Sequence, residues 1–308
     1  MAGHGTKAIV AAFFANLGIA IAKFMAFVFT GASSMLAEAI HSLADTGNQA
    51  LLLFGGRSAR REETETHQFG FARERYFWSF VVALVLFTLG GVFAIYEGIE
   101  KLRHPHEIDS PAWAFGVLIF AVVLESFSFR TAIHEAKPLK GEASWWSFIK
   151  RSRNPELPVV LLEDLGALAG LVIALIGVTL AFSTGEARWD AAGSLAIGIL
   201  LVVIASILAI EMRSLLLGES ASSSQQSEIA AAVEGAPHVV RLIHMRTQHL
   251  GPDDLLVAAK VEFAPDLSVS ALADAIDVTE AAIRTVVPTA TLIYLEPDLF
   301  EAGKAGSD

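Results

Sequence analysis

The chain has 308 residues, of which 54% are hydrophobic and only 18% are charged, and its mean hydropathy is +0.54. Soluble domains usually carry about 25% charged residues, so this composition predicts a membrane protein and excludes disordered and collagen-like chains. The absence of cysteine excludes disulfide frameworks and thiolate metal sites, and the net charge of −11 argues against a nucleic-acid binder.

Crossing a bilayer as a helix takes roughly 20 mainly apolar residues, and six stretches meet or nearly meet this requirement. The second and the fifth differ from the others because they carry ionisable residues in their middle. We predict an α-helical transmembrane domain of six helices over residues 1–217. In chain order the stretches are Ala8–Thr30, Ser34–Phe54, Phe77–Tyr96, Ala112–Ile133, Leu157–Phe182 and Ala191–Leu217.

The distribution of arginine and lysine predicts the orientation. The loop after the second stretch is rich in arginine and the loop after the fourth is rich in lysine and arginine, whereas the loops of opposite parity hold only Lys101, Arg103 and Arg188. Positive residues gather on the cytoplasmic side, so we expect both termini there. No signal peptide is evident, and the Ala- and Gly-rich composition favours a bacterial cytoplasmic (inner) membrane over an organelle.

The acidic end of the chain is predicted to be a separate cytoplasmic domain. Its hydrophobic pattern indicates a helix over 227–235, strands over 239–248 and 255–263, a helix over 270–286 and a strand over 290–297. The order α-β-β-α-β predicts an α+β, ferredoxin-like dimerisation domain over residues 218–300. Residues 301–308 are expected to be a disordered tail.

The ionisable residues of the second stretch point to metal chemistry. Glu38, His41 and Asp45 follow one another at spacings of three and four, so they share one face of a helix. An imidazole and a carboxylate one turn apart suit a borderline divalent metal such as zinc. The fifth stretch adds the adjacent acids Glu163 and Asp164, which point about 100° apart in a helix, so only one is expected to face a shared site.

Two structural alternatives remain open at this point. The acids of the fifth stretch can be satisfied within a polar network, with Lys23, Arg130 or backbone groups as donors. The polar residues of the second stretch can instead form a hydrogen-bond network between helices, or this stretch can lie as a short helix near the membrane interface. In the fourth stretch, Glu125 and Arg130 are expected to pair with each other at the cytoplasmic end.

The segments GASSMLAEAIHSLADTGNQ and HQFGFARERYFW, the acid of the fifth stretch and the α-β-β-α-β tail resemble the cation diffusion facilitator family. Within it, HSLADTGNQ, RERYFWSFVVAL and LLEDLGALAG resemble the branch that contains the ninth human zinc transporter. In that family, two ligands from the second span and two from the fifth hold zinc or a similar ion midway across the membrane. The resemblance implies His41, Asp45 and Asp164 as ligands. Val160 stands at the fourth ligand position, with Glu163 or Asn48 as the possible replacement.

The resemblance also suggests peripheral features. The loop after the second span keeps His67, but Thr64 and Phe71 replace its expected companions, so a packing role is favoured there. In the tail, the candidate ligands are His244, His249 and Glu296.

A salt bridge between the two domains is suggested by the same family pattern. Arg73 or Arg75 stands at a basic position that pairs with an acid after the sixth span, and Glu219 is placed to be that acid.

These features predict a proton-coupled antiporter that works by alternating access. A buried imidazole and carboxylates can hold protons when empty and must release them to bind a cation. The family implies efflux of a divalent metal, most simply zinc, from the cytoplasm by a homodimer. A non-transporting membrane regulator or partner subunit, an exporter of manganese, iron or cobalt, and an intramembrane metal hydrolase are the alternatives. The last is disfavoured because no HExxH-like motif is present, so no enzymatic activity is expected.

Overall fold

The computed structural model describes residues 6–30, 33–104 and 111–300. Contacts within the chain divide it into two units, one of residues 1–63 and 74–213 and the other of residues 64–73 and 214 onward. The last long helix of the first unit ends at Leu217. We keep the proposed domain boundary between residues 217 and 218. The predicted tail, residues 301–308, lies outside the described residues.

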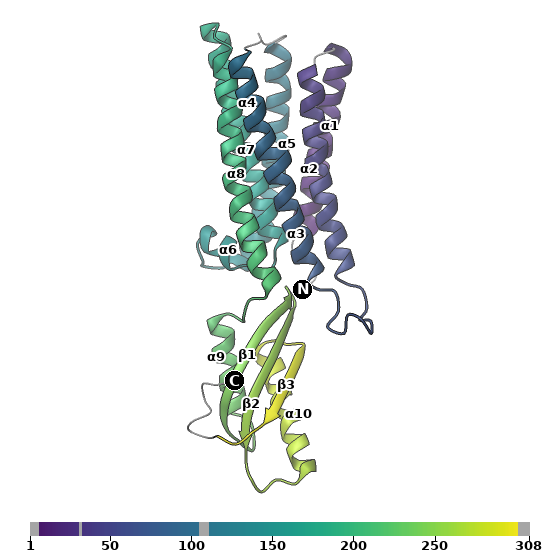
Figure 1. Ribbon diagram of the computed structural model, residues 1–308, viewed down its shortest axis with the longest axis vertical. Coiled ribbons are helices and arrows are strands. Elements are labelled where there is room, and N and C mark those ends of the chain that lie inside the picture. The colour runs from purple at the N-terminus through teal and green to yellow at the C-terminus, as the bar shows by residue number, and fades with distance from the viewer. Residues whose placement is uncertain (1–5, 31–32, 105–110, 301–308) are drawn as a thin grey trace. The chain divides into compact units, whose positions relative to one another are not determined.

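The first unit is a bundle of long helices (Figure 1). The prediction of an α-helical membrane domain is confirmed, because each of the six predicted stretches is helical. The elements are α1 (Thr6–Thr30), α2 (Ser33–Ser58), α3 (Glu74–Val85), the π-helix η1 (Leu86–Val92), α4 (Phe93–Arg103), α5 (Pro111–Lys140), α6 (Trp145–Arg151), α7 (Glu156–Thr184) and α8 (Arg188–Leu217).

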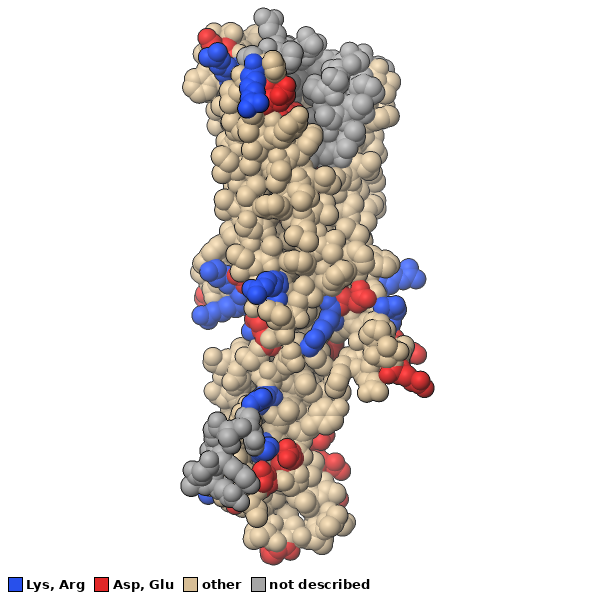
Figure 2. Space-filling model, viewed as in Figure 1, with Lys and Arg blue, Asp and Glu red and all other residues tan. Residues whose placement is uncertain are grey.

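Among the described residues, five helical segments are long and apolar enough to cross a membrane. They lie in α1, in the continuous run from α3 to α4, in α5, in α7 and in α8. Figure 2 shows the matching surface, a broad belt without charged side chains on the helical unit, with Lys, Arg, Asp and Glu at its ends. The predicted second span is also helical, as α2, but it is the most polar of the long helices because it buries several polar side chains.

The third predicted span, Phe77–Tyr96, is part of a longer helical run from Glu74 to Arg103 with a π-helical middle. A uniform α-helix was expected here, and the π segment is a correction. Gly91 lies in this segment, and a Cβ atom there would be 2.6 Å from Cγ2 of Val202 in α8. The two backbones therefore approach more closely than a side chain would allow.

Helix α1 packs against α2, α5 and α7. Contacts join α1 to α2 and to α5, α5 to α7, and α2 to α3. The last turn of α7 ends at Gly185, which adopts the left-handed conformation with φ 71° that glycine tolerates best. The short helix α6 was not predicted, because its seven residues are too few to show a helical period.

The second unit is a two-layer α+β domain, as predicted. Its elements are α9 (Ser223–Glu234), β1 (Val239–Gly251), β2 (Asp254–Phe263), α10 (Val269–Val286) and β3 (Leu292–Pro297). The sheet order is β1-β2-β3, with β1 antiparallel and β3 parallel to β2. Helix α9 begins four residues earlier than expected, because Ser222 and Gln225 form a capping box at its start.

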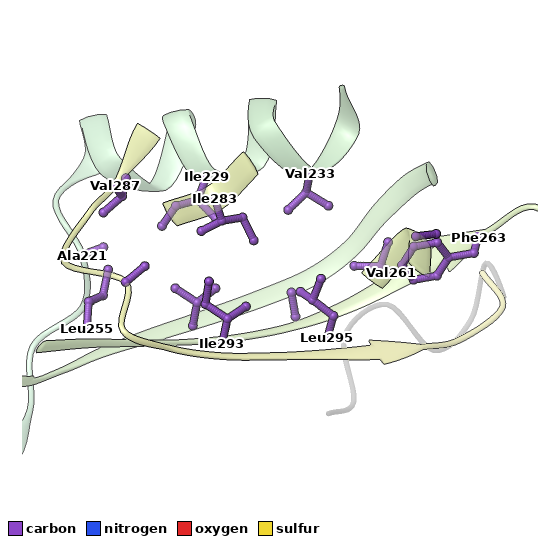
Figure 3. Close-up of a cluster of buried hydrophobic side chains, with 14 residues drawn as sticks. Ala221, Ile229, Val233, Leu255, Val261, Phe263, Ile283, Val287, Ile293 and Leu295 are labelled. Atoms are coloured by element: carbon purple, nitrogen blue, oxygen red, sulfur yellow. The ribbon is translucent and has the colours of Figure 1, made fainter. Parts of the chain in front are cut away.

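The core of this unit lies between the two helices and one face of the sheet (Figure 3). Alternate residues of β2 are buried, as expected for a strand that packs on one face only. Ile229 of α9, Ile283 of α10 and Leu255 of β2 are each fully buried. Because these side chains come from separate elements, the apolar core holds the five elements together.

Candidate functional site

Polar side chains from α1, α2, α5 and α7 are buried inside the helical unit. Burying polar groups within a membrane domain is costly, so such clusters point to function. Each of the following is at most 7% exposed: Lys23, Ser42, Thr46, Asn48, Gln49, Glu125, Ser128, Glu163 and Asp164.

The carboxylate of Glu163 on α7 accepts hydrogen bonds from two side chains of α2. The Nδ2 amide of Asn48 donates to Oε1 of Glu163 at 3.3 Å, and Nε2 of Gln49 donates to Oε2 at 2.6 Å. The amide oxygens of Asn48 and Gln49 are themselves buried, and no hydrogen-bond partner meets them within the described part of the chain. These two amide oxygens are hydrogen-bond acceptors on the residues that donate to the carboxylate of Glu163.

The carboxylate of Asp164, in contrast, accepts a hydrogen bond from a side chain of α5. The hydroxyl of Ser128 donates to Oδ2 of Asp164 at 2.8 Å. Both acids of the pair are therefore buried, and the angular offset between them aims Glu163 at α2 and Asp164 at α5. The sequence led us to expect only one of the two to face a shared site. Both side chains are buried with different hydrogen-bond partners, and which of them faces a metal stays a prediction.

Glu125 of α5 belongs to the same cluster. It is 5% exposed, and the charged groups that act on it are Asp164, Asp45 and Lys23. Its Oε2 atom has no hydrogen-bond partner among the described residues. The expected pair with Arg130 is wrong, because Arg130 is exposed while Glu125 faces the interior.

Lys23 of α1 is the buried cation of this cluster. Its ammonium donates to the hydroxyl of Ser42 at 2.9 Å, and the hydroxyl of Thr46 donates to the backbone carbonyl of Ser42. Lys23 also attracts Glu125 electrostatically. A polar network between helices is therefore present, but the donors to Glu163 and Asp164 described above are Asn48, Gln49 and Ser128, which were not expected in that role.

Asp45 is half-buried on α2, and its charge acts on both Glu125 and Glu163. His41 lies within α2, but its side chain is outside the described residues. No group of three or more described His, Asp or Glu side chains is close enough to hold a metal ion. Since the predicted set of His41, Asp45 and Asp164 has only two described members, it stays a prediction.

Val160 occupies the remaining ligand position and is fully buried. It lies one helical turn before Asp164 on α7, so an apolar side chain stands where a metal ligand would stand in the four-ligand pattern. The buried oxygens of Glu163 and Asn48 lie on the two helices that supply the predicted ligands. They remain the possible replacements.

A buried ion pair lies at the beginning of α7. The guanidinium of Arg75 donates from Nε to Oε1 of Glu156 at 2.5 Å and from a terminal nitrogen to Oε2 at 2.7 Å. The nearby hydroxyl of Tyr76 donates to the carbonyl of Arg153, and burial lowers the pKa of the Arg153 guanidinium. The predicted pairing of Arg73 or Arg75 with Glu219 stays a prediction.

The peripheral candidates lie apart in the second unit. His67 packs its ring on Phe71 at 4.6 Å, which agrees with the packing role favoured above. In β1, His244 accepts a hydrogen bond from Arg246, and His249 is buried with Nδ1 3.3 Å from the carbonyl of Gly251. Glu296 is exposed on β3. A metal site at these residues also stays a prediction.

Gln49 and Ser128 were not identified from the sequence, and Glu125 was expected only as the partner of Arg130. Gln49 directly follows the candidate ligand Asn48, and this adjacency was the signal that could have indicated a role for Gln49. Glu125 and Ser128 lie one turn apart in an apolar run, which places them on one face of a helix. That pairing of an acid and a hydroxyl within an apolar stretch could have indicated an inward-facing polar stripe.

Comparison with known proteins supports a transport module. The family model for the cation efflux transmembrane domain matches residues 9–217. The chain is 35% identical over 267 residues to the Xenopus laevis protein named proton-coupled zinc antiporter SLC30A9, mitochondrial, covering 85% of this chain and 47% of that protein. It is 29% identical over 264 residues to metal tolerance protein C4 of Arabidopsis thaliana, covering 84% and 57%.

A bacterial protein is also similar. Zinc transporter ZitB of Escherichia coli is 24% identical over 201 residues, covering 65% of this chain and 58% of that protein. The chain spans about half the length of the curated relatives it matches.

Proposed function

Because the chain belongs to the cation efflux family, we propose that it carries a divalent metal ion across a membrane in exchange for protons, with zinc as the first candidate. Members of this family are transporters rather than enzymes, as expected from the sequence. The observation that carries the proposal is the buried acidic cluster of Glu125, Glu163 and Asp164, with Asp45 acting on it and Lys23 beside it.

The donor set suits a transition-metal cargo. Asp45 and Asp164 supply carboxylate oxygens, and His41, one turn before Asp45, supplies an imidazole nitrogen. Zinc accepts three protein ligands with water in a fourth position, which is the position that Val160 leaves without a donor. Glu163 with Asn48 offers additional oxygen at that side, and oxygen-rich sites also suit manganese.

Charge balance provides the link to protons. Asp45, Glu125, Glu163 and Asp164 together carry four acidic groups, whereas Lys23 contributes one positive charge. In a medium of low dielectric constant, several neighbouring carboxylates cannot all be ionised unless a cation or protons compensate them. A dication that binds must displace protons from its ligands, and protons that return release it.

Alternating access would move this exchange from one side to the other. The ligands come from α2 and α7, and Glu163 ties these helices together through Asn48 and Gln49. A metal that draws Glu163 or the amide oxygens toward itself would break those bonds and free α2 to shift against α7. Binding and helix movement are then coupled by the same carboxylate.

The test is metal uptake into inside-out proteoliposomes with an imposed proton gradient. Asp45→Asn and Asp164→Asn are expected to abolish zinc transport, because each removes a ligand charge while keeping side-chain size. Glu186→Gln is the matched control, since Glu186 is exposed outside the helices. Transport at the parental rate by both site variants would refute the proposed site.

The second candidate is a membrane regulator or partner subunit without transport activity. The buried Val160 at a ligand position favours it, because valine supplies no donor atom and the metal site is left incomplete. Titration of the purified protein with zinc, manganese, iron and cobalt separates the two. Stoichiometric binding supports the transporter, whereas no binding of any of these ions supports the regulator.

Assembly and location complete the proposal. We propose a homodimer in a bacterial cytoplasmic membrane with both termini in the cytoplasm. The basic loops support the orientation. Cross-linking of single cysteines introduced into the cysteine-free chain tests the dimer, and labelling of the same cysteines from either side tests the orientation.

A further inference from the structure

Helix α6 and the end of α5 form a surface that the transport proposal does not use. Ser144 caps α6 by accepting a hydrogen bond from the amide of Ser147. Phe148 and Ile149 are buried against the helical unit, whereas Trp145 and Trp146 are 39% and 50% exposed. The seven-residue helix is therefore anchored by two buried apolar side chains and exposes two tryptophan rings.

Basic side chains surround these rings. Residues 137–151 contain four basic residues and one acidic residue, Glu142. The ammonium of Lys150 lies 4.9 Å from the ring centre of Trp146, and that of Lys140 lies 5.3 Å from Trp145. Lys140 is also bonded to backbone carbonyls of its own loop, so it has a local structural role. Lys137, Lys150 and Arg151 are exposed.

The depth of α6 follows from its neighbour α8. Between Asp190 and Glu211, α8 has no charged residue over about 20 residues, which as a helix spans about 30 Å, the thickness of a bilayer's hydrocarbon core. Glu211 therefore marks the edge of that core. Lys150 and Arg153 both act electrostatically on Glu211, which places α6 at the same level. Figure 1 shows α6 beside this part of α8.

We propose that α6 and the end of α5 are a docking surface for anionic phospholipids of the surrounding bilayer. Tryptophan rings favour the headgroup level, where their apolar bodies and polar N–H groups are both accommodated. Lys137, Lys150 and Arg151 bind the lipid phosphates, because the segment is strongly basic. Only residues 152–155 separate α6 from α7, so lipid bound here restrains the start of the helix that carries Glu163 and Asp164.

The experiment uses the full chain in vesicles of phosphatidylcholine mixed with phosphatidylglycerol. Phenylalanine replaces Trp78, Trp113 and Trp189, which leaves the α6 pair as the fluorophores. A doxyl quencher near the headgroup is carried by either lipid at the same mole fraction. We expect stronger quenching by the phosphatidylglycerol probe, and we expect the difference to shrink as salt rises.

The decisive variant is Lys137→Gln with Lys150→Gln and Arg151→Gln. It should lower the preference for phosphatidylglycerol by up to about fivefold per charge removed. Arg103→Gln with Arg188→Gln, at the last residue of α4 and the first of α8, is a control that removes two positive charges elsewhere, and it should retain the preference. Equal quenching by both probes, no quenching by either, or a preference that survives the triple variant would each overturn the proposal.

Discussion

The ion pair between Arg75 and Glu156 is expected to contribute strongly to the stability of the helical unit. The side chain of Glu156 is 5% exposed and that of Arg75 is 17% exposed, and two hydrogen bonds of 2.5 and 2.7 Å join them. Replacing Arg75 by methionine keeps the apolar stem but leaves a buried carboxylate without its guanidinium. Breaking a buried pair in this way costs about 3–5 kcal/mol.

The position of Glu156 reduces that cost. It lies in the first turn of α7, where the helix dipole stabilises a negative charge by about 0.3–1 kcal/mol. We therefore expect the lower end, about 3 kcal/mol. At about 2–4 °C per kcal/mol for a unit of this size, Arg75→Met should lower the melting temperature by roughly 6–12 °C.

Two comparisons make the measurement decisive. The double variant Arg75→Met with Glu156→Gln removes both charges and should be more stable than Arg75→Met alone. Arg61→Met is the matched control, because Arg61 is 54% exposed and pairs with Glu74, so its ion pair is worth about 0–1 kcal/mol. Thermal unfolding of the purified variants gives the values. If Arg75→Met melts no lower than Arg61→Met, burial of the pair has been misjudged.

Four further outcomes are expected. Val160→His should tighten zinc binding by about tenfold or more, as measured by titration calorimetry, because it supplies a fourth ligand; unchanged affinity would place the site elsewhere. Zinc affinity should fall as pH falls, and binding should release protons into a weakly buffered solution, since protons compete for the same donors; binding without proton release would contradict the exchange. Gly98→Val should cost about 1–3 kcal/mol in thermal unfolding, because a Cβ atom there would lie 2.8 Å from the backbone nitrogen of Leu195; an unchanged melting temperature would show that α4 and α8 can separate. Ile283→Ala should cost about 2–5 kcal/mol and speed hydrogen exchange in the sheet, with no change in the helical unit; equal acceleration in both units would argue against separate cores.

The architecture could be predicted because its signals are local. Long apolar runs gave the helices of the first unit, and alternation in LLVAAKVEF gave β2 with its buried face. The start of α9 was placed too late, since the weight was given to apolar residues rather than to the capping residue Ser222. Helix α6 was missed because an element of seven residues shows no period.

The cluster could be predicted only in part. Asp164 and Asp45 were identified from their residue types and spacing, whereas the role of Glu125 depends on depth. Helix α5 continues to Lys140, seven residues beyond the predicted end at Ile133, so Glu125 lies deeper within the helix than expected. Which side chains Glu163 and Asp164 reach depends on where α2 and α5 lie relative to α7, and no spacing within one helix contains that information.

The π-helical segment Leu86–Val92 has a consequence for how this protein tolerates changes in length. Each π turn accommodates one residue more than an α turn, so the third span contains a surplus residue at mid-height. Deleting one residue there would convert the segment to regular α-helix, and the residues before and after it would keep their orientation toward the neighbouring helices. The same excision in α7 would rotate everything after it by about 100° and carry Asp164 or its neighbours out of phase. Homologues with a shortened third helix can therefore be expected, whereas α7 should permit no such loss.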